Sequence, residues 1–317
     1  MAASRIHTWL LTLATYAAVW AMLPWLSARV GLCGEAGVLA GLAGGLVPRW
    51  PGVHGEGLTA VAIGLLMVAF VRRWTSAGGT PPGSLLLGIA AGVSFHVQPA
   101  LLPVVLGWMA FELWWSRERR KWLFSALVAL GIVVACVPWG FRNYRAFGAL
   151  FFVRSNLGLE LRMGNHEGAA ASMEAMERQP QHVHVHPRLL EAEARKLQEL
   201  GEVVYMRAAR REALGWIREN PGTFVGLTAS RAAHWWLGPL YDPPGAFVVT
   251  TLTILALAGA WLTFPTLGAP QRTALLVPLL TYPLVYYLVA YMPRYREPLD
   301  WLLLLLAGAA IWRWMDR

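Results

Sequence analysis

Long apolar runs recur along this chain, and they constrain its fold more than any other feature. A bilayer core about 30 Å thick needs roughly 20 apolar residues per helix, and slightly shorter runs are tolerated inside a bundle. The pattern predicts about nine membrane helices, near residues 7–27, 34–48, 57–72, 84–98, 100–115, 122–139, 246–264, 272–291 and 299–314. We therefore expect an all-α polytopic membrane protein.

The balance of apolar and charged residues excludes most classes of soluble protein. Hydrophobic residues make up 56% of the chain and charged residues only 14%, which lies outside the usual soluble balance. The formal net charge is +9, but the basic residues form short clusters beside apolar runs, where they act as orientation signals. Nucleic acid is therefore not a predicted partner.

Three basic clusters, at residues 72–73, 117–121 and 313–317, predict the orientation of the helices. Membrane proteins keep such clusters on the cytoplasmic side. Tracing the helices from these anchors places the following parts on the outer side: the N-terminus, 49–56, 96–99, 140–245 and 292–298.

The outer region 140–245 divides the chain into an N-terminal transmembrane bundle (1–139) and C-terminal transmembrane helices (246–317). Mixed charges at three- and four-residue spacing predict helices near 188–200 and 202–219. Asn220-Pro221 predicts a break, because proline disfavours helical backbone at the residue before it. We expect a small helical extracytoplasmic domain.

The stretch 138–165 leaves the last apolar run of the N-terminal bundle with several arginines and asparagines. Pro138 and Trp139 are predicted to end the membrane helix, and Arg142 and Asn143 follow within one turn. Arginine at this depth either reaches lipid headgroups without further function or binds a lipid phosphate. Both interpretations remain open.

A second basic cluster, Arg294, Tyr295 and Arg296, lies in a predicted outer loop, where the orientation rule disfavours positive charge. Guanidinium groups bind phosphate through two parallel hydrogen bonds, so this pair suits a polyprenyl phosphate. The alternative is a salt bridge to Glu297 or Asp300 that tightens the loop.

Polar residues at two helix ends are further candidates. His54 and Glu56 come at the start of a predicted helix, where an acidic side chain is either a cap or a general base. His96 and Gln98 come where Pro99 is predicted to interrupt a helix at membrane depth. Such groups line a cavity or satisfy freed backbone groups.

The run QHVHVHP at 181–187 places His182, His184 and His186 on one face of an extended strand. This arrangement suits zinc or copper, but no cysteine or carboxylate lies at a recognised metal-site spacing. We therefore interpret the run as an exposed loop and predict no metal.

Taken together, these pieces resemble bacterial membrane glycosyltransferases of the GT-C superfamily, in the dolichyl-phosphate-mannose-protein mannosyltransferase-like group that includes aminoarabinose lipid A transferases. The family pattern Pro-Trp-x-x-Arg-Asn is matched by Pro138, Trp139, Arg142 and Asn143. An Asn-x-Gly and a Gly-Asn follow, matched by Asn156, Gly158, Gly164 and Asn165. Near the C-terminus, Arg-Tyr-Arg-x-Pro is matched by Arg294, Tyr295, Arg296 and Pro298.

The resemblance implies an enzyme of the bacterial inner membrane that transfers a sugar from a polyprenyl-phosphate donor on the outer face. The arginines would stabilise the leaving phosphate, and no cofactor is implied. The family's first outer loop carries an acidic pair that includes the base. Because this sequence has no acidic residue before Glu35, it resembles a family member without the N-terminal helix and acidic loop, and Glu56 becomes the fallback base.

Two other functions are compatible with the sequence. The first is a non-catalytic GT-C-like subunit that serves as a structural or lipid-binding partner of another membrane protein, which the missing acidic loop favours. The second is a transporter, which the helix break at Pro99 allows but no inverted repeat supports.

Overall fold

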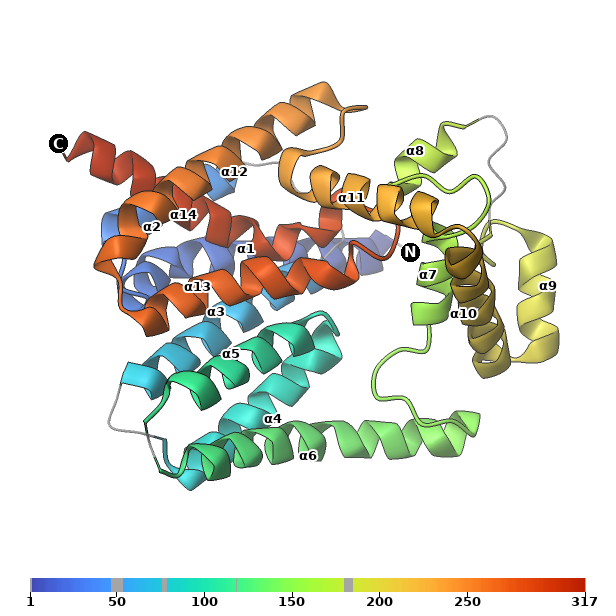
Figure 1. Cartoon of the computed structure of the whole chain (residues 1–317), viewed down its shortest axis with the longest axis horizontal. Coiled ribbons are helices and arrows are strands. Elements are labelled where there is room, and N and C mark those ends of the chain that lie inside the picture. Colours follow the sequence, from blue (N-terminus) through green and yellow to red (C-terminus); the bar gives the residue numbers. More distant parts are fainter. Residues whose placement is uncertain (1, 47–53, 76–78, 118, 180–184, 317) are drawn as a thin grey trace. The chain divides into compact units, whose positions relative to one another are not determined.

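A computed structural model of the chain describes residues 2–46, 54–75, 79–117, 119–179 and 185–316. In these residues the secondary structure is helical, apart from one isolated bridge between Ser172 and Tyr291. The helices form two compact units (Figure 1). The first unit is Met1–Cys136, Val249–Tyr282 and Arg296–Arg317, and the second is Val137–Val248 and Pro283–Tyr295.

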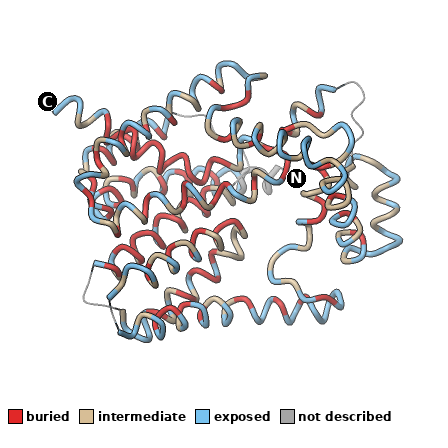
Figure 2. Tube along the Cα trace, viewed as in Figure 1, coloured by how far each residue is buried: buried red, intermediate tan, exposed pale blue. Residues whose placement is uncertain are grey.

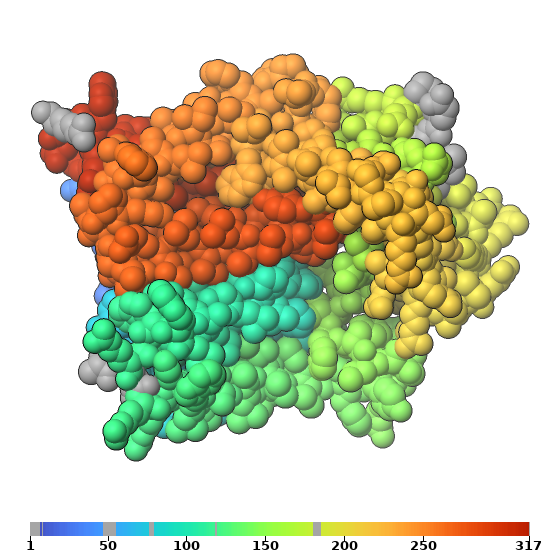
Figure 3. All heavy atoms as spheres, in the orientation of Figure 1, coloured from blue at the N-terminus to red at the C-terminus, as the bar shows by residue number. Residues whose placement is uncertain are grey.

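The first unit contains most of the apolar helices. They are α1 (Ala2–Arg29), α2 (Gly34–Leu46), α3 (His54–Thr75), α4 (Pro81–Val97), α5 (Leu101–Trp115), α13 (Ala269–Thr281) and α14 (Glu297–Met315). It also includes most of α6 (Lys121–Phe147) and of α12 (Pro243–Thr263). In the space-filling view α13 lies directly against α5 (Figure 3), where Gly107 faces Val277.

Within the described residues, five helical segments are long and apolar enough to cross a bilayer: Trp9–Arg29, Gly55–Thr75, Lys121–Phe147, Pro243–Thr266 and Glu297–Met315. This confirms the prediction of a helical membrane protein, whereas the expected nine spans are not confirmed. Helices form at all nine predicted places, but α2 and α13 have 13 residues each. At about 1.5 Å per residue, such a helix is shorter than the bilayer core.

Two predicted helix ends were wrong. Helix α6 continues through Pro138 to Phe147. A proline removes only one backbone N–H donor, so the helical conformation can continue on both sides of it. The run 272–291 instead breaks early: α13 ends at Thr281 and a 3-10 turn, Tyr282–Val285, follows.

Helix α14 forms the centre of the first unit. It is buried from Glu297 to Ala310, as the continuous buried colouring in Figure 2 shows, and it packs against α2 and α3. Small residues allow this packing, since a Cβ on Gly308 would lie 2.5 Å from the carbonyl oxygen of Ala36. Helix pairs in membranes commonly approach through such positions.

The end of α3 that carries Arg72 and Arg73 is joined to α5 by a buried ion pair. Arg73 at the end of α3 binds the carboxylate of Glu112 on α5, with Nη2 to Oε1 at 2.7 Å. Ser84 accepts a hydrogen bond from Arg73, and Trp74 donates one to Glu112. Arg73 was predicted only as an orientation signal, and its structural role depends on a partner 39 positions away.

The second unit contains the remaining helices and the last turns of α6. They are α7 (Leu157–Gly164), α8 (Met173–Glu177), α9 (Glu191–Leu200), α10 (Glu202–Glu219) and α11 (Pro221–Leu237). The predicted helices near 188–200 and 202–219 correspond to α9 and α10. The predicted break is also present, because Asn220 is the N-cap of α11 and Pro221 its first residue.

A polar network joins α7, α9 and α10. Arg162 binds Glu193 through two hydrogen bonds of 2.7 and 2.9 Å, and Tyr205 donates to the same carboxylate at 2.5 Å. The hydrogen bond from Arg162 is the largest cause that lowers the pKa of Glu193, from 4.5 to about 2. The charged form of Glu193 therefore stabilises this unit.

We expect Glu193→Gln to remove a pH-dependent part of this stability. Because the folded pKa lies below the unfolded value, the contribution of about 2 kcal/mol is fully present above pH 4.5 and disappears as the pH falls towards 2. The measurement is hydrogen exchange of α9 and α10 between those pH values. Glu191→Gln is the matched control, since Glu191 lies on the same helix with a side chain 78% exposed. Equal acid sensitivity of the wild type and Glu193→Gln would contradict the prediction.

Candidate functional site

The last turns of α6 and the segment that follows line an open cavity of about 320 Å³ in the second unit. Its lining is mostly aromatic, basic and amide side chains, together with one carboxylate, one hydroxyl and one aliphatic side chain: Trp139, Arg142, Asn143, Phe147, Phe151, Val153, Arg154, Ser155, Asn156 and Glu202. Gly148 makes this arrangement possible. Its positive φ of 65° ends α6 and reverses the chain, a conformation that glycine adopts without strain.

Arg142 and Asn143, both predicted from the sequence, line this cavity with different roles. The Arg142 guanidinium lies 5.2 Å from the Trp139 ring and 5.7 Å from the Phe147 ring, and it donates to Asn143 Oδ1 at 2.9 Å. Asn143 is buried and donates to the carbonyl of Phe151 at 2.8 Å. Asn143 therefore holds the returning chain, while Arg142 presents positive charge to the cavity.

Glu160 on α7 is a functional candidate that the sequence interpretation missed. Asn156, which lines the cavity, donates to Glu160 Oε1 at 3.1 Å. Burial raises the pKa of the Glu160 carboxyl, and the charges of Arg294 and Arg154 and the Asn156 hydrogen bond partly oppose this rise. The only sequence signal was the four-residue spacing of Asn156 and Glu160 close to Arg154.

Arg294 belongs to the second unit and extends from a stack of aromatic rings. Its guanidinium lies 5.5 Å from the Tyr295 ring. Tyr295 stacks on Tyr286 at 4.6 Å, and Tyr286 stacks on the buried Trp235 of α11 at 5.5 Å. Three rings thus orient Arg294. Its positive charge lowers the pKa of the Glu160 carboxyl and so opposes the larger rise that burial causes.

Asn165 is buried and links the end of α7 to the segment that precedes Arg294. Its amide donates to the carbonyls of Leu161 and Leu288 at 2.7 and 2.9 Å. Arg231, fully buried on α11, donates to Asn165 Oδ1 at 3.3 Å and to the carbonyls of Gly164 and Tyr287. These contacts favour a structural role for Asn165.

Arg296 belongs to the first unit, unlike Arg294. Its Nη1 lies 3.3 Å from Asp300 Oδ1 on α14, and both side chains are largely buried. Glu297 accepts a hydrogen bond from Tyr16 on α1. The salt bridge to Asp300, one of the two alternatives for this arginine, is therefore present.

The other candidates also belong to the first unit. Glu56 is half-buried in the first turn of α3, and α3 begins at His54, whose side chain lies outside the described structure. His96 Nε2 lies 3.2 Å from the carbonyl oxygen of Ala135, and Gln98 caps the end of α4. The predicted interruption by Pro99 is present, since α4 ends at Val97 and α5 begins at Leu101.

The histidine run is only partly visible. His182 and His184 lie outside the described residues, and His186 Nδ1 accepts a hydrogen bond from the backbone N–H of Arg188 at 3.0 Å. Among the residues that the structure describes, no group of three histidine, cysteine or acidic side chains is arranged to hold a metal.

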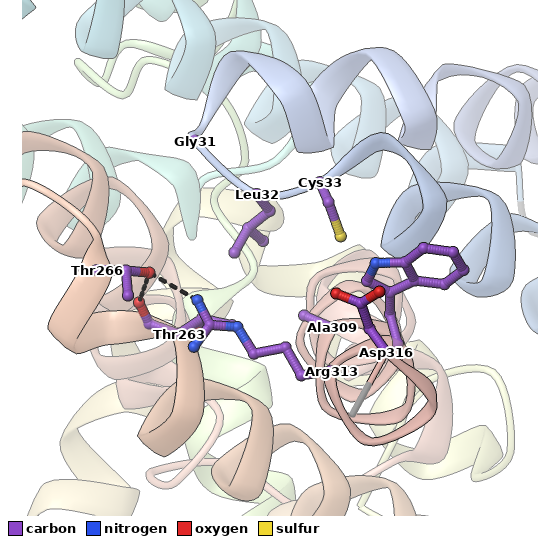
Figure 4. Close-up of a pocket in the computed structure, with 9 residues that line it drawn as sticks. Gly31, Leu32, Cys33, Thr263, Thr266, Ala309, Arg313 and Asp316 are labelled. Carbon is purple, nitrogen blue, oxygen red and sulfur yellow. Dashed lines mark hydrogen bonds between the residues drawn. The ribbon is translucent and has the colours of Figure 1, made fainter.

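A smaller cavity of about 200 Å³ lies in the first unit where α12 and α14 end (Figure 4). Arg313 donates to the carbonyl of Leu262 and, at 2.9 Å, to Thr266 Oγ1. Thr266 in turn donates to the carbonyl of Thr263 at 2.8 Å. Arg313, near the end of α14, therefore binds the end of α12 and satisfies one of its terminal carbonyls, that of Leu262.

The fold and the apolar spans define an all-helical protein embedded in a membrane. Comparisons with known protein families, curated proteins and solved structures found no match to this chain.

Proposed function

We propose that this protein is a membrane glycosyltransferase that uses a polyprenyl-phosphate-linked sugar as donor on the outer face of the bacterial inner membrane. The observation that carries the proposal is the cavity of the second unit, which is lined by Arg142 and Arg154 together with aromatic side chains. One wall is the end of α6, which is itself long enough to cross a bilayer. A lipid whose chain lies beside α6 could place its phosphate at this cavity.

The charges of the cavity support a phosphate ligand. No carboxylate of the described residues forms an ion pair within 4 Å with Arg142, Arg154 or Arg294. Guanidinium groups bind phosphate through paired hydrogen bonds, and aromatic faces such as those of Trp139 and Phe147 suit the apolar face of a sugar. Arg296 is left out of this set because it pairs with Asp300.

The proposed reaction is attack of an acceptor hydroxyl or amine on the anomeric carbon. The new bond forms as the bond from that carbon to the phosphate oxygen breaks, and the electron pair of the broken bond stays on the phosphate. Arg142 and Arg294 stabilise this growing negative charge, which is electrostatic catalysis by fixed cations. The acceptor proton passes to a general base. Glu56, the base expected from the sequence, belongs to the first unit and does not line this cavity.

Binding of undecaprenyl phosphate to the full chain in lipid nanodiscs tests the proposal. We expect Arg142→Ala to weaken binding roughly tenfold or more, since a hydrogen bond to a charged group is worth about 1.5–3 kcal/mol. Arg145→Ala is the matched control. Arg145 lies on the same helix, is exposed, and stacks on Phe141 away from the lining of the cavity. Equal affinities of the wild type and Arg142→Ala would contradict the assignment.

A non-catalytic lipid-binding subunit, acting with a partner membrane protein, is the second candidate. Glu202, which lines the cavity, accepts a hydrogen bond from Ser155, and Glu160 next to the cavity wall accepts one from Asn156. This favours binding without transfer. The two functions are separated by release of undecaprenyl phosphate from a sugar-linked donor: an enzyme releases it and loses this activity in Arg142→Ala, whereas a binding subunit releases none.

A further inference from the structure

We propose that α11 lies along the membrane surface and inserts one exposed face among the lipids. This face is formed by Val225, Ala229, Ala233 and Leu237, which follow one another at four-residue spacing on one side of the helix. The partner is the lipid bilayer itself and not another protein. The inference goes beyond the proposed function and does not depend on sugar transfer.

Helix α11 turns its charge inward, the reverse of what a water-facing helix does. Arg231 is completely buried, and no other Asp, Glu, Lys or Arg occurs in α11. Trp235, one turn further on, is buried as well. By contrast, Val225 is 64% exposed and Leu237 50% exposed. A buried charge combined with an exposed apolar face indicates that this face meets lipid or protein instead of water.

The neighbouring helices of the same unit have the opposite pattern. On α10 the exposed positions are mostly charged, among them Arg207, Arg211 and Glu219. On α9, Glu191 and Arg195 form an ion pair in which both side chains are exposed. These surfaces suit water, so the apolar face of α11 is a local feature and not a general property of the unit.

The chain continues from this face directly into a membrane span. After a short turn α12 begins, and the segment Pro243–Thr266 is long and apolar enough to cross a bilayer. The turn is tight, since a Cβ on Gly238 would lie 2.5 Å from Cα of Ala246 on α12. Leu240 in the turn and Phe247 on α12 are both exposed. Because Gly238 lies against α12, the bilayer that receives α12 also meets the end of α11.

The length of α11 and its buried contacts favour an orientation along the surface. At about 1.5 Å per residue, its 17 residues extend about 25 Å, which is less than a bilayer core about 30 Å thick. Arg231 near its middle binds Asn165 and two backbone carbonyls of the same unit. A helix with one polar side and one apolar side lies in the plane of the membrane interface.

Membrane contact of α11 also determines the depth of the segment before Arg294. Arg231 donates to the carbonyl of Tyr287, and Trp236 donates to the Tyr287 hydroxyl at 2.8 Å. An interfacial helix lies at the boundary between headgroups and acyl chains. The segment that leads to Arg294 is therefore held near the level of the lipid phosphates.

Nitroxide labels on the full-length protein, in vesicles of phosphatidylethanolamine and phosphatidylglycerol, test the proposal. Ala229→Cys and Ala233→Cys place the label on the exposed face of α11, and Gln198→Cys, at an exposed position of α9, is the matched control. The native thiols of Cys33 and Cys136 are removed by alanine substitution. Oxygen concentrates in the bilayer, whereas a nickel chelate stays in water. We expect the ratio of oxygen to chelate collisions to be several-fold higher at both α11 positions than at the control.

Two results of the labelling experiment would overturn the inference. Chelate collisions at Ala229 and Ala233 as frequent as those at Gln198 would place the face in water. Rare collisions with both reagents would mean that a partner protein or a second copy of this chain covers the face.

A second measurement needs no substitution. The wild-type protein is irradiated in vesicles that contain a phospholipid with a diazirine near the glycerol end of its acyl chains, and mass spectrometry identifies the peptides that carry lipid. We expect adducts in residues 221–240 and none in residues 191–200. Adducts in α12 without any in 221–240 would contradict the inference and leave the proposed function intact, since binding of undecaprenyl phosphate is measured separately.

Discussion

Replacing Gly88 by alanine is expected to destabilise the first unit by about 2–3 kcal/mol, because two helices cross at this residue without room for a methyl group. A Cβ on Gly88 would overlap the carbonyl oxygen of Val128 on α6. The contact is reciprocal, since a Cβ on Gly131 would lie 2.7 Å from the backbone nitrogen of Ile89. The helices must separate, which removes packing on both sides.

The surrounding sequence explains why the crossing forms here. Gly88 and Gly92 are four residues apart on α4 and face Gly131 and Ala135, which have the same spacing on α6. Such pairs of small residues bring membrane helices into backbone contact.

Unfolding of the full chain in detergent, titrated with a denaturing detergent, measures the effect of Gly88→Ala. Gly45→Ala is the matched control, because Gly45 is helical and no other atom lies within 4 Å of its Cβ position. Alanine also has the higher helix propensity, so Gly45→Ala should be neutral or stabilising. A Gly88→Ala protein as stable as the Gly45→Ala protein would show that the helices do not meet at this position.

Arg231→Met is expected to destabilise the second unit by about 3 kcal/mol, the balance of two opposing terms. The variant leaves the carbonyl oxygens of Gly164 and Tyr287 and Oδ1 of Asn165 without this donor. Removal of the charge itself is favourable, since burial lowers the pKa of Arg231 to about 10. The unsatisfied acceptors prevail because there are three of them in a buried site.

The loss of stability in Arg231→Met should also appear as faster local opening of the segment that Arg231 contacts. Arg231 connects α11 to the end of α7 and to the backbone before Arg294, so hydrogen exchange should become faster in residues 286–295. Arg195→Met is the control, because Arg195 is 69% exposed in its pair with Glu191. If exchange in 286–295 is unchanged while Arg294 still contributes to phosphate binding, Arg231 does not position this segment.

Several elements followed from the sequence because their causes are local. Run length and apolar composition predicted where apolar helices form, and the backbone restriction before proline predicted the break at Asn220-Pro221. The end of α6 was predicted wrongly from the same kind of signal. Whether Pro138 ends a helix depends on the hydrogen bonds of the following residues, and these continue to Phe147.

The candidate site shows the same division. Arg142 and Arg294 were identified as basic residues near helix ends, which is a property of the sequence alone. Their surroundings were not visible there: Arg296 pairs with Asp300 in the first unit, whereas Arg294 lies against the Tyr295 ring in the second. Neighbouring residues in the loop thus have different partners.

The sequence by itself determined that this chain forms apolar helices that suit a bilayer, because helix formation and membrane insertion depend on composition over about 20 consecutive residues. Only the tertiary structure decided which charges meet. Arg73 and Glu112 are 39 positions apart in the chain and Arg162 and Glu193 are 31 apart, and their pairing depends on how complete helices pack. Packing is set by shape and burial over many side chains, and these have no counterpart in any local pattern.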